Sequence, residues 1–245
     1  MGLLKKRSRF TYTNKMQAVI LAGGLGTRLR PITDKMPKHI VRVGNKPFLE
    51  HIINLLKRNA INDIVLCVGY LWEQIKDYFK DGKKFGVDIK YSVEKELMGT
   101  GGALKLAERY LENDFLLLYG DSYLNIDLKK LMELHKEINK KCTMVVYDNK
   151  SKIFARNNVE IDSTGYVVNY DKKTQDEKMD YVDAGVLTFK KSILDFIPQN
   201  KKVSLEEDVF PKLIKMKELY SFKSKNRFYD IGTMQRLKVF EKVFK

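Results

Sequence analysis

Two hydrophobic periods alternate along the first 150 residues of the chain. Short apolar runs rich in β-branched residues are typical of buried strands, and apolar residues spaced three or four apart are typical of amphipathic helices. The runs predict strands over 17–22, 63–69, 88–93, 114–119 and 142–147. The wider spacing predicts helices over 48–58, 72–80, 101–111 and 127–139. Fully apolar strands separated by helices indicate a mostly parallel sheet covered on both faces, which is a Rossmann-like, doubly wound α/β fold.

The pattern becomes richer in strands after about residue 150. Alternating runs on either side of a turn at 163–165 predict a β-hairpin. Further strands are predicted over 181–189, 218–223 and 227–230, and helices over 191–197, 205–216 and 233–244. No stretch rich in Pro, Gly or Ser interrupts this order. We therefore expect one domain over 16–245, with a small β-rich substrate-binding portion.

The chain is basic, because its 46 Lys and Arg residues exceed its 31 Asp and Glu residues and give a net charge of +15. Five basic residues and no acid lie in 1–15, which predicts a flexible basic tail before Met16. Beyond this tail the charges are mixed. No zinc-finger, RNP or basic-aromatic motif is present, so we expect no nucleic-acid partner.

Membrane and secretion signals are absent from the sequence. No apolar run approaches the roughly 18–20 residues that a membrane span needs, and no secretory h-region follows the basic N-terminus. Cys67 and Cys142 lie inside apolar strand-like runs, as is typical of buried free thiols in a reducing compartment. We expect a cytoplasmic protein, and the sequence leaves a homo-oligomer open.

A glycine-rich segment, LAGGLGTRLRPITDKMPK, follows the first predicted strand over 21–38. Glycines at this place let a backbone approach phosphates closely, and free N–H groups bind anions. The spacing is neither the dinucleotide GxGxxG nor the P-loop GxxxxGK[ST]. Arg28 and Lys38 add two cations. Taken alone, the segment is either a phosphate-binding loop or a plain tight turn.

The run GGLGTRLRPIT…PK, followed by KPFLEHIINLL over 46–56, resembles the signature of the sugar-1-phosphate nucleotidyltransferases. The resemblance covers about 16–244. It implies the GT-A-like fold of that family, with the β-rich portion binding the sugar. It also implies a glycine-rich loop wrapped around a nucleoside triphosphate, with Arg28 and Lys38 on the phosphates in the transition state.

Four later segments resemble family motifs in family order. GTGGA over 99–103 resembles the loop that contacts the nucleobase and ribose, and Gly-Asp at 120–121 resembles the metal-binding turn. DAGV over 183–186 resembles the strand that faces the sugar, and FYDIGT over 228–233 resembles the motif with the second metal ligand. Many members have Glu-Lys where this chain has Asp171-Lys172.

The resemblance implies a set of site residues. The implied catalytic residues are Arg28, Lys38 and Asp121. The implied nucleotide-binding residues are Leu21, Ala22, Gly23, Gly24, Gly26, Thr27, Arg28, Lys38, Glu94, Gly99, Thr100, Gly101 and Asp121. The implied sugar-phosphate residues are Asp171, Lys172, Asp183 and Gly185, and the implied Mg²⁺ ligands are Asp121 and Asp230. Without the resemblance, Asp121 could be a turn former and Asp230 could help cap the final helix.

The implied reaction joins a nucleoside triphosphate and a sugar 1-phosphate into a nucleotide sugar and pyrophosphate. Its nucleophile is a phosphate oxygen that is already anionic, so no general base is needed, and the sequence shows no convincing Ser-His-Asp or Cys-His set. The reaction requires two polyanions to be brought together and their charge neutralised. Mg²⁺ suits this task because it binds one or two carboxylates together with phosphate oxygens and water.

Glu94 lies five residues before Gly99, where the resemblance places the group that reads the base. An ionised carboxylate only accepts hydrogen bonds, and guanine offers two donors on one edge, so Glu94, or its neighbour Glu96, favours GTP. The short single-domain chain and its segment SVEKELMGTGGAL look similar to D-glycero-D-manno-heptose 1-phosphate guanylyltransferases.

Several alternatives stay open. They are a UTP- or CTP-dependent member such as an N-acetylmuramate 1-phosphate uridylyltransferase, a mannose-1-phosphate guanylyltransferase, and a cytidylyltransferase of an alditol or amino-alcohol phosphate. Two further ones are a catalytically silent nucleotide-sugar-binding regulator and a basic module that docks on anionic lipid or nucleic acid.

Overall fold

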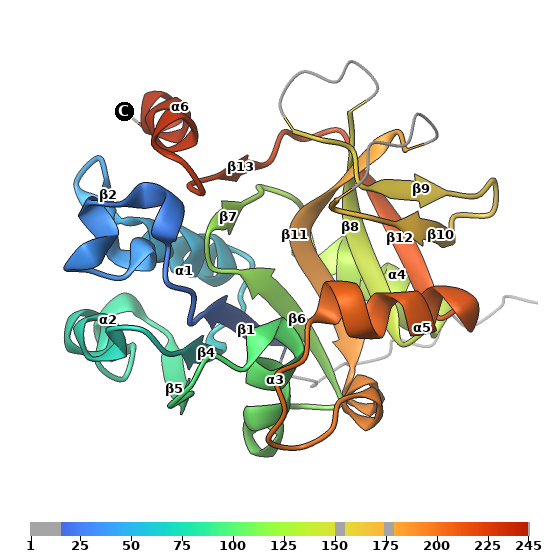
Figure 1. Ribbon diagram of the computed structural model, residues 1–245, viewed down its shortest axis with the longest axis horizontal. Helices are drawn as coiled ribbons and strands as arrows, with labels where there is room; N and C mark the ends of the chain where they lie inside the picture. Colours follow the sequence, from blue (N-terminus) through green and yellow to red (C-terminus); the bar gives the residue numbers. More distant parts are fainter. Residues whose placement is uncertain (1–15, 150–154, 174–178, 245) are drawn as a thin grey trace, which may run out of the picture.

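Strands from both halves of the chain form one central sheet (Figure 1). The computed structural model describes residues 16–149, 155–173 and 179–244, so the predicted basic tail lies outside the described residues. Four parallel strands in the order β5-β4-β1-β6 form one half of the sheet. Their bounds are β1 Gln17–Ala22, β4 Asp63–Val68, β5 Asp88–Val93 and β6 Asp114–Tyr119.

Helices cover both faces of this sheet. On one face, α1, α2, α4 and α6 share a core with Ala18 and Ile20 of β1, and on the other α3 and α5 pack with Val19. The helices are α1 Phe48–Arg58, α2 Trp72–Phe79, α3 Gly99–Leu106, α4 Leu128–Ile138, α5 Phe210–Lys215 and α6 Met234–Val243. Because successive residues of a strand point to opposite faces, an all-apolar strand serves both cores. The predicted doubly wound α/β fold is confirmed.

The other half of the sheet is mixed. β11 runs antiparallel to β6 and to β8, and β12 runs parallel to β8. The β9–β10 hairpin joins the start of β11 at Tyr181. The bounds are β8 Cys142–Asp148, β9 Val159–Ile161, β10 Val167–Tyr170, β11 Tyr181–Lys190 and β12 Leu219–Ser224. β8 therefore points the same way as β6, but β11 lies between them in the opposite direction.

Short elements complete the structure at the carboxyl edge of the sheet. β13 pairs with β7, and β2 pairs with β3. Their bounds are β2 Arg42–Val43, β3 Lys46–Pro47, β7 Ser122–Tyr123 and β13 Tyr229–Asp230. Two predicted helices differ from the observed ones. The helix expected over 101–111 ends at Leu106, and the helix expected over 191–197 is a 3-10 helix, Lys191–Phe196. A π-helical turn, Leu205–Val209, leads into α5.

The strand order places a ligand-binding position at the ends of β1 and β6. β1 pairs with β4 on one side and with β6 on the other, and the chain runs from β1 to β4 and β5 before it crosses back to β6, so the strand order reverses at β1. In open α/β sheets ligands bind at such a switch point, outside the carboxyl ends of the strands. In the part of the chain that the structure describes, no helix is long and apolar enough to cross a membrane.

Candidate active site

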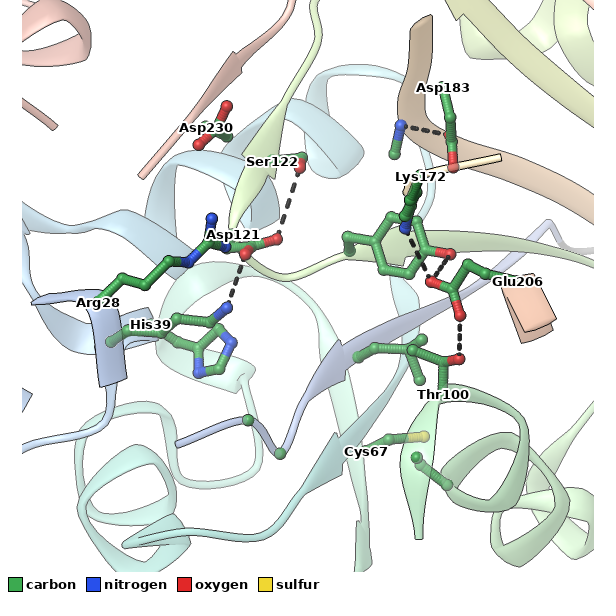
Figure 2. A pocket seen from close by; sticks show the side chains of 18 of the residues that line it. Arg28, His39, Cys67, Thr100, Asp121, Ser122, Lys172, Asp183, Glu206 and Asp230 are labelled. Carbon is green, nitrogen blue, oxygen red and sulfur yellow. Dashed lines mark hydrogen bonds and ion pairs between the residues drawn. The ribbon is translucent and has the colours of Figure 1, made fainter. Parts of the chain in front are cut away.

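A cavity of about 670 Å³ opens at the ends of β1 and β6 (Figure 2). The predicted nucleotide residues that line it are Leu21, Gly23, Gly24, Arg28, Lys38, Glu94, Gly99, Thr100 and Asp121. The predicted sugar-phosphate and metal residues that line it are Lys172, Asp183, Gly185, Asp121 and Asp230. The lining does not include Ala22, Gly26, Thr27, Gly101 or Asp171. Segments far apart in the sequence thus meet at the predicted place.

The glycine-rich loop packs against Glu94. Gly23 follows the buried end of β1, and a Cβ at this position would lie 1.9 Å from Oε1 of Glu94. The other carboxylate oxygen, Oε2, accepts a hydrogen bond from the backbone N–H of Met98 at 2.9 Å. Burial raises the pKa of Glu94 above its ordinary value. Glu94 is therefore fixed between the glycine-rich loop and the segment that leads into α3.

The GTGG motif is explained by close packing. Gly99 has a φ of +72°, and a Cβ there would lie 2.5 Å from the carbonyl oxygen of Val203. The same carbonyl accepts hydrogen bonds from the N–H groups of Gly101 and Gly102 at 2.9 and 3.2 Å. A side chain at Gly99 would break this contact. Gly101 thus supports the start of α3 from outside the cavity.

Lys38 and Asp121 form an ion pair inside the cavity. The distance from Lys38 Nζ to Asp121 Oδ2 is 2.6 Å. Burial opposes the charged form of Asp121, but the Lys38 ammonium, through its charge and its hydrogen bond, keeps the pKa of Asp121 below its ordinary value. Asp121 is therefore ionised at neutral pH.

Asp230 lies next to Asp121 through strand pairing. β13 pairs with β7, and the N–H of Ile231 donates to the carbonyl of Asp121 at 3.0 Å. The carboxylate of Asp230 accepts hydrogen bonds from Gly232 N–H and from Nη1 of Arg236, both at 2.9 Å. Asp230 does not cap the final helix, because the side chain of Thr233 occupies the N-cap of α6.

The carboxylates of Asp121, which directly precedes β7, and of Asp230 in β13 therefore both line the cavity. Among residues 16–149, 155–173 and 179–244, no group of three or more His, Cys, Asp or Glu side chains could hold a metal ion. Mg²⁺ rarely uses an all-protein cage and prefers one or two carboxylates with phosphate oxygens. Asp121 and Asp230 thus fit a Mg²⁺ ion that arrives with a nucleotide.

The end of the cavity where the sequence predicted the sugar phosphate is formed by β11 and the β9–β10 hairpin. Asp183 accepts hydrogen bonds from the Gly185 N–H at 2.9 Å and from the Tyr170 hydroxyl at 3.1 Å. Burial raises the pKa of Asp183. Lys172 reaches the cavity, whereas its neighbour Asp171 accepts a hydrogen bond from the Lys173 N–H and lies outside the lining.

Glu206 is a cavity residue that the sequence did not single out. Its carboxylate accepts hydrogen bonds from Thr100, Tyr119, Lys172 and Ser204. It lies in the run LEEDV, and the run alone does not show which of its three acids turns inward. Tyr119 was also missed, although its place just before Gly120-Asp121 was a signal. Further cavity residues that were missed include His39, Cys67, Arg156, Lys202 and Arg236.

Two buried groups in the cavity are unsuited to acid–base or nucleophilic chemistry. Burial, together with the charge of Lys38, lowers the pKa of His39 to about 3. Burial and the nearby Glu94 raise the pKa of Cys67 to about 12. Because the thiolate is the reactive form of cysteine, Cys67 is inert at neutral pH. His39 and Cys67 therefore supply neither a base nor a nucleophile at neutral pH.

Comparisons with known proteins identify the family of the chain. The family described as nucleotidyl transferase matches residues 17–242. A D-glycero-alpha-D-manno-heptose 1-phosphate guanylyltransferase from Campylobacter jejuni is 36% identical over 192 residues, which are 78% of this chain and 84% of that protein. A mannose-1-phosphate guanyltransferase 2 from Candida glabrata is 35% identical over 223 residues, which are 89% of this chain and 61% of that protein.

A solved structure is also similar. The crystal structure of HddC from Yersinia pseudotuberculosis complexed with GMP-PN superimposes with a TM-score of 0.79 and 28% identity, over 94% of this chain and 100% of that chain. These matches confirm the resemblance that the glycine-rich loop and the later motifs indicated. The chain therefore belongs to the nucleotidyl transferase family, among its sugar-1-phosphate nucleotidyltransferases.

Proposed function

We propose that the chain transfers the guanylyl group of GTP to D-glycero-D-manno-heptose 1-phosphate and releases pyrophosphate. The observation that carries this proposal is the convergence of the glycine-rich loop, Lys38, Asp121, Lys172 and Asp230 on one cavity at the switch point of the sheet. Their charges suit two phosphorylated substrates and a divalent ion.

The reaction needs positioning and charge neutralisation. The backbone around Gly23 and Gly24 lies at the end of β1, where it would approach the triphosphate closely. Arg28 and Lys38 supply positive charge beside it, and Lys172 supplies it at the sugar end. A phosphate oxygen of the sugar 1-phosphate would attack the α-phosphorus, and the bond to pyrophosphate would break. The nucleophile is already anionic, which agrees with the absence of a usable base at His39.

Asp121 and Asp230 would hold Mg²⁺. When bound, the ion would neutralise the charge that develops on the phosphate oxygens. Asp121 is kept ionised by Lys38, and Asp230 is presented by β13 beside it. Arg28 lies close to Asp230, since both Asp230 Oδ1 and Arg28 Nη2 approach Gly232, at 3.0 and 3.2 Å from the position that a Cβ would take there.

Glu94 is the proposed reader of the base. Its carboxylate is held against Gly23 and bonded to Met98 N–H, so its position is set before a nucleotide binds. Guanine would offer two donors to this acceptor, whereas uracil would offer one donor between two carbonyls. Glu94→Gln should therefore lower the ratio of GTP turnover to UTP turnover. An unchanged ratio in this variant, or equal use of UTP or CTP by the unmodified protein, would exclude this role.

The decisive assay measures pyrophosphate release with four nucleoside triphosphates against a panel of sugar 1-phosphates, with and without Mg²⁺. We expect turnover only with GTP and a manno-configured sugar 1-phosphate, and only with the metal. Turnover limited to mannose 1-phosphate would favour the second candidate, a mannose-1-phosphate guanylyltransferase, which the 35% identical relative supports. Binding without turnover of any pair would favour a silent regulator.

The cellular setting follows from the same chemistry. Cys67 and Cys142 are free and buried, which fits a reducing compartment, and we propose the cytoplasm. GTP and the sugar 1-phosphate are the proposed partners, and whether copies of the chain associate is open to measurement by light scattering.

A further inference from the structure

The carboxylate of Glu206 is bonded to side chains from both ends of the cavity (Figure 2). Its Oε1 accepts hydrogen bonds from Lys172 Nζ at 3.1 Å and from the Tyr119 hydroxyl at 2.8 Å. Its Oε2 accepts them from the Thr100 hydroxyl at 2.6 Å and from the Ser204 hydroxyl at 2.9 Å. We propose that Glu206 is a positioning residue that fixes Lys172, on the sugar-phosphate side, relative to Thr100, on the nucleotide side. The inference rests on the proposed function, which assigns these two sides.

Glu206 has no acceptor position left for a substrate. An ionised carboxylate offers about four lone-pair positions, and the four side-chain donors fill them. Burial alone would raise the pKa of Glu206, but Lys172 and the hydrogen bonds from Thr100 and Tyr119 lower it to about 2. The group is therefore ionised throughout the neutral range. It acts through the side chains that it holds.

The link to the nucleotide side is rigid. The Thr100 hydroxyl donates to Glu206 and also accepts a hydrogen bond from Leu205 N–H at 2.8 Å. The carbonyl of Val203 accepts from Gly101 N–H at 2.9 Å, and Gly99 leaves room for that carbonyl. The start of α3 and the segment that carries Glu206 are thus clamped together. A shift of one moves the other.

The link to the sugar side orders a flexible side chain. The Lys172 side chain is 49% exposed, and its Nζ lies 5.4 Å from the centre of the Tyr119 ring. An ammonium has three donors, and Glu206 takes one, which leaves two for a phosphate. A lysine without an anchor would lose rotamer freedom only when the substrate binds, at a cost in affinity. The ion pair with Glu206 already restricts the rotamers of Lys172 before the substrate binds, so less entropy is lost on binding.

Glu206→Gln is the direct test. Glutamine keeps the size of the side chain, but its nitrogen can only donate. Either the donors on Oε1, Lys172 and Tyr119, or the donors on Oε2, Thr100 and Ser204, therefore lose their acceptor. We expect the KM for the sugar 1-phosphate to rise at least about 10-fold, measured with GTP and D-glycero-α-D-manno-heptose 1-phosphate, and with mannose 1-phosphate in a second arm. Glu207→Gln is the matched control, because Glu207 is 62% exposed, pairs with Lys173 and does not line the cavity. It should keep the KM within about twofold.

A double-mutant cycle separates positioning from a general structural effect. If Glu206 acts through Lys172, then Glu206→Gln should add less than twofold to the KM of Lys172→Ala. Thr100→Val, which removes the hydroxyl that donates to Glu206, should raise the same KM. Fold-changes of Glu206→Gln and Lys172→Ala that multiply, or a KM for Glu206→Gln within twofold of normal, would overturn the inference.

Crystal structures of the two glutamine variants decide the question if the unmodified protein turns over no substrate pair. That outcome would remove the proposed function but not the geometry. Lys172 should then be displaced in Glu206→Gln and unchanged in Glu207→Gln. Lys172 in its original position in both variants would show that Glu206 does not hold it.

Discussion

Lys38 and Asp121 lie 83 residues apart in the sequence and form an ion pair at 2.6 Å, with side chains only 16% and 23% exposed. Each charge reduces the cost of burying the other, and removal of one partner leaves the other uncompensated. The same two groups are the ones we assign to the triphosphate and the metal. Stability and turnover should therefore both depend on them, but in different ways.

Lys38→Met should lower turnover by roughly 100-fold or more, because it removes a cation from the developing phosphate charge. It should also lower the free energy of unfolding by about 1–3 kcal/mol, since Asp121 loses its partner. In Lys38→Met/Asp121→Asn the stability should partly recover while the activity stays low. Pyrophosphate release and urea unfolding measure the two effects. Turnover within threefold of normal in Lys38→Met would contradict the assignment.

Gly23→Ala should disturb the base site while leaving the fold intact. A Cβ at this position would lie 1.9 Å from Glu94 Oε1, so the carboxylate must move away from the glycine-rich loop. We expect weaker GTP binding and a smaller preference for GTP over UTP, measured by calorimetry and by the pyrophosphate assay. Gly24→Ala is the steric control, because its Cβ would meet only Lys38 atoms at 3.9 Å. Equal loss of base preference in both variants would show that the contact with Glu94 is not the cause.

Much of the fold follows from local pattern. The amphipathic run Phe48–Arg58 was predicted at both ends, because its apolar residues leave a single face to bury. The place of β11 between β6 and β8 was not predicted, because strand neighbours depend on pairing between distant segments. The start of α3 at Gly99 was also missed, because glycine disfavours helices. The helix begins there because Gly99 packs closely against Val203.

The candidate site also contains residues that the sequence predicted and residues that it did not. Residues that stand in motifs, such as Lys38, Asp121 and Asp230, were predicted from the sequence as site residues, and they line one cavity. Glu206 was missed because three acids follow one another and the π-helical turn decides which one faces inward. No local pattern encodes that choice.

The buried His135 should make the protein less stable in mild acid. Burial, with smaller effects of Lys190 and Lys136, lowers the pKa of His135 to about 4, although Asp114 opposes this. The folded state therefore keeps the ring neutral, whereas the unfolded chain takes up a proton below about pH 6.5. The contribution of the neutral His135 ring to the free energy of unfolding is complete above pH 6.5 and is lost as the pH falls toward 4.

The slope that this histidine adds approaches about 1.4 kcal/mol per pH unit below its unfolded pKa. His135→Gln should lower stability at pH 7, because the Nδ1 contact with Thr143 at 2.9 Å is lost, but it should flatten the dependence between pH 6 and 4.5. Urea unfolding across this range measures the slope. A slope as steep in His135→Gln as in the unmodified protein would show that other groups, such as His39, carry the effect.

Asp230→Asn should raise the Mg²⁺ concentration needed for half-maximal turnover by about 10-fold or more, because one of two charged ligands becomes neutral. Chelation should stop pyrophosphate release, and added Mg²⁺ should restore it. Thr233→Ala is the structural control: it removes the N-cap of α6 three residues away and should cost about 1 kcal/mol of stability with no change in Mg²⁺ dependence. Arg236→Met frees the Asp230 carboxylate from its 2.9 Å partner and should leave the Mg²⁺ requirement equal or lower. If Asp230→Asn and Thr233→Ala shift the requirement equally, then Asp230 acts through the strand–helix junction and is not a metal ligand.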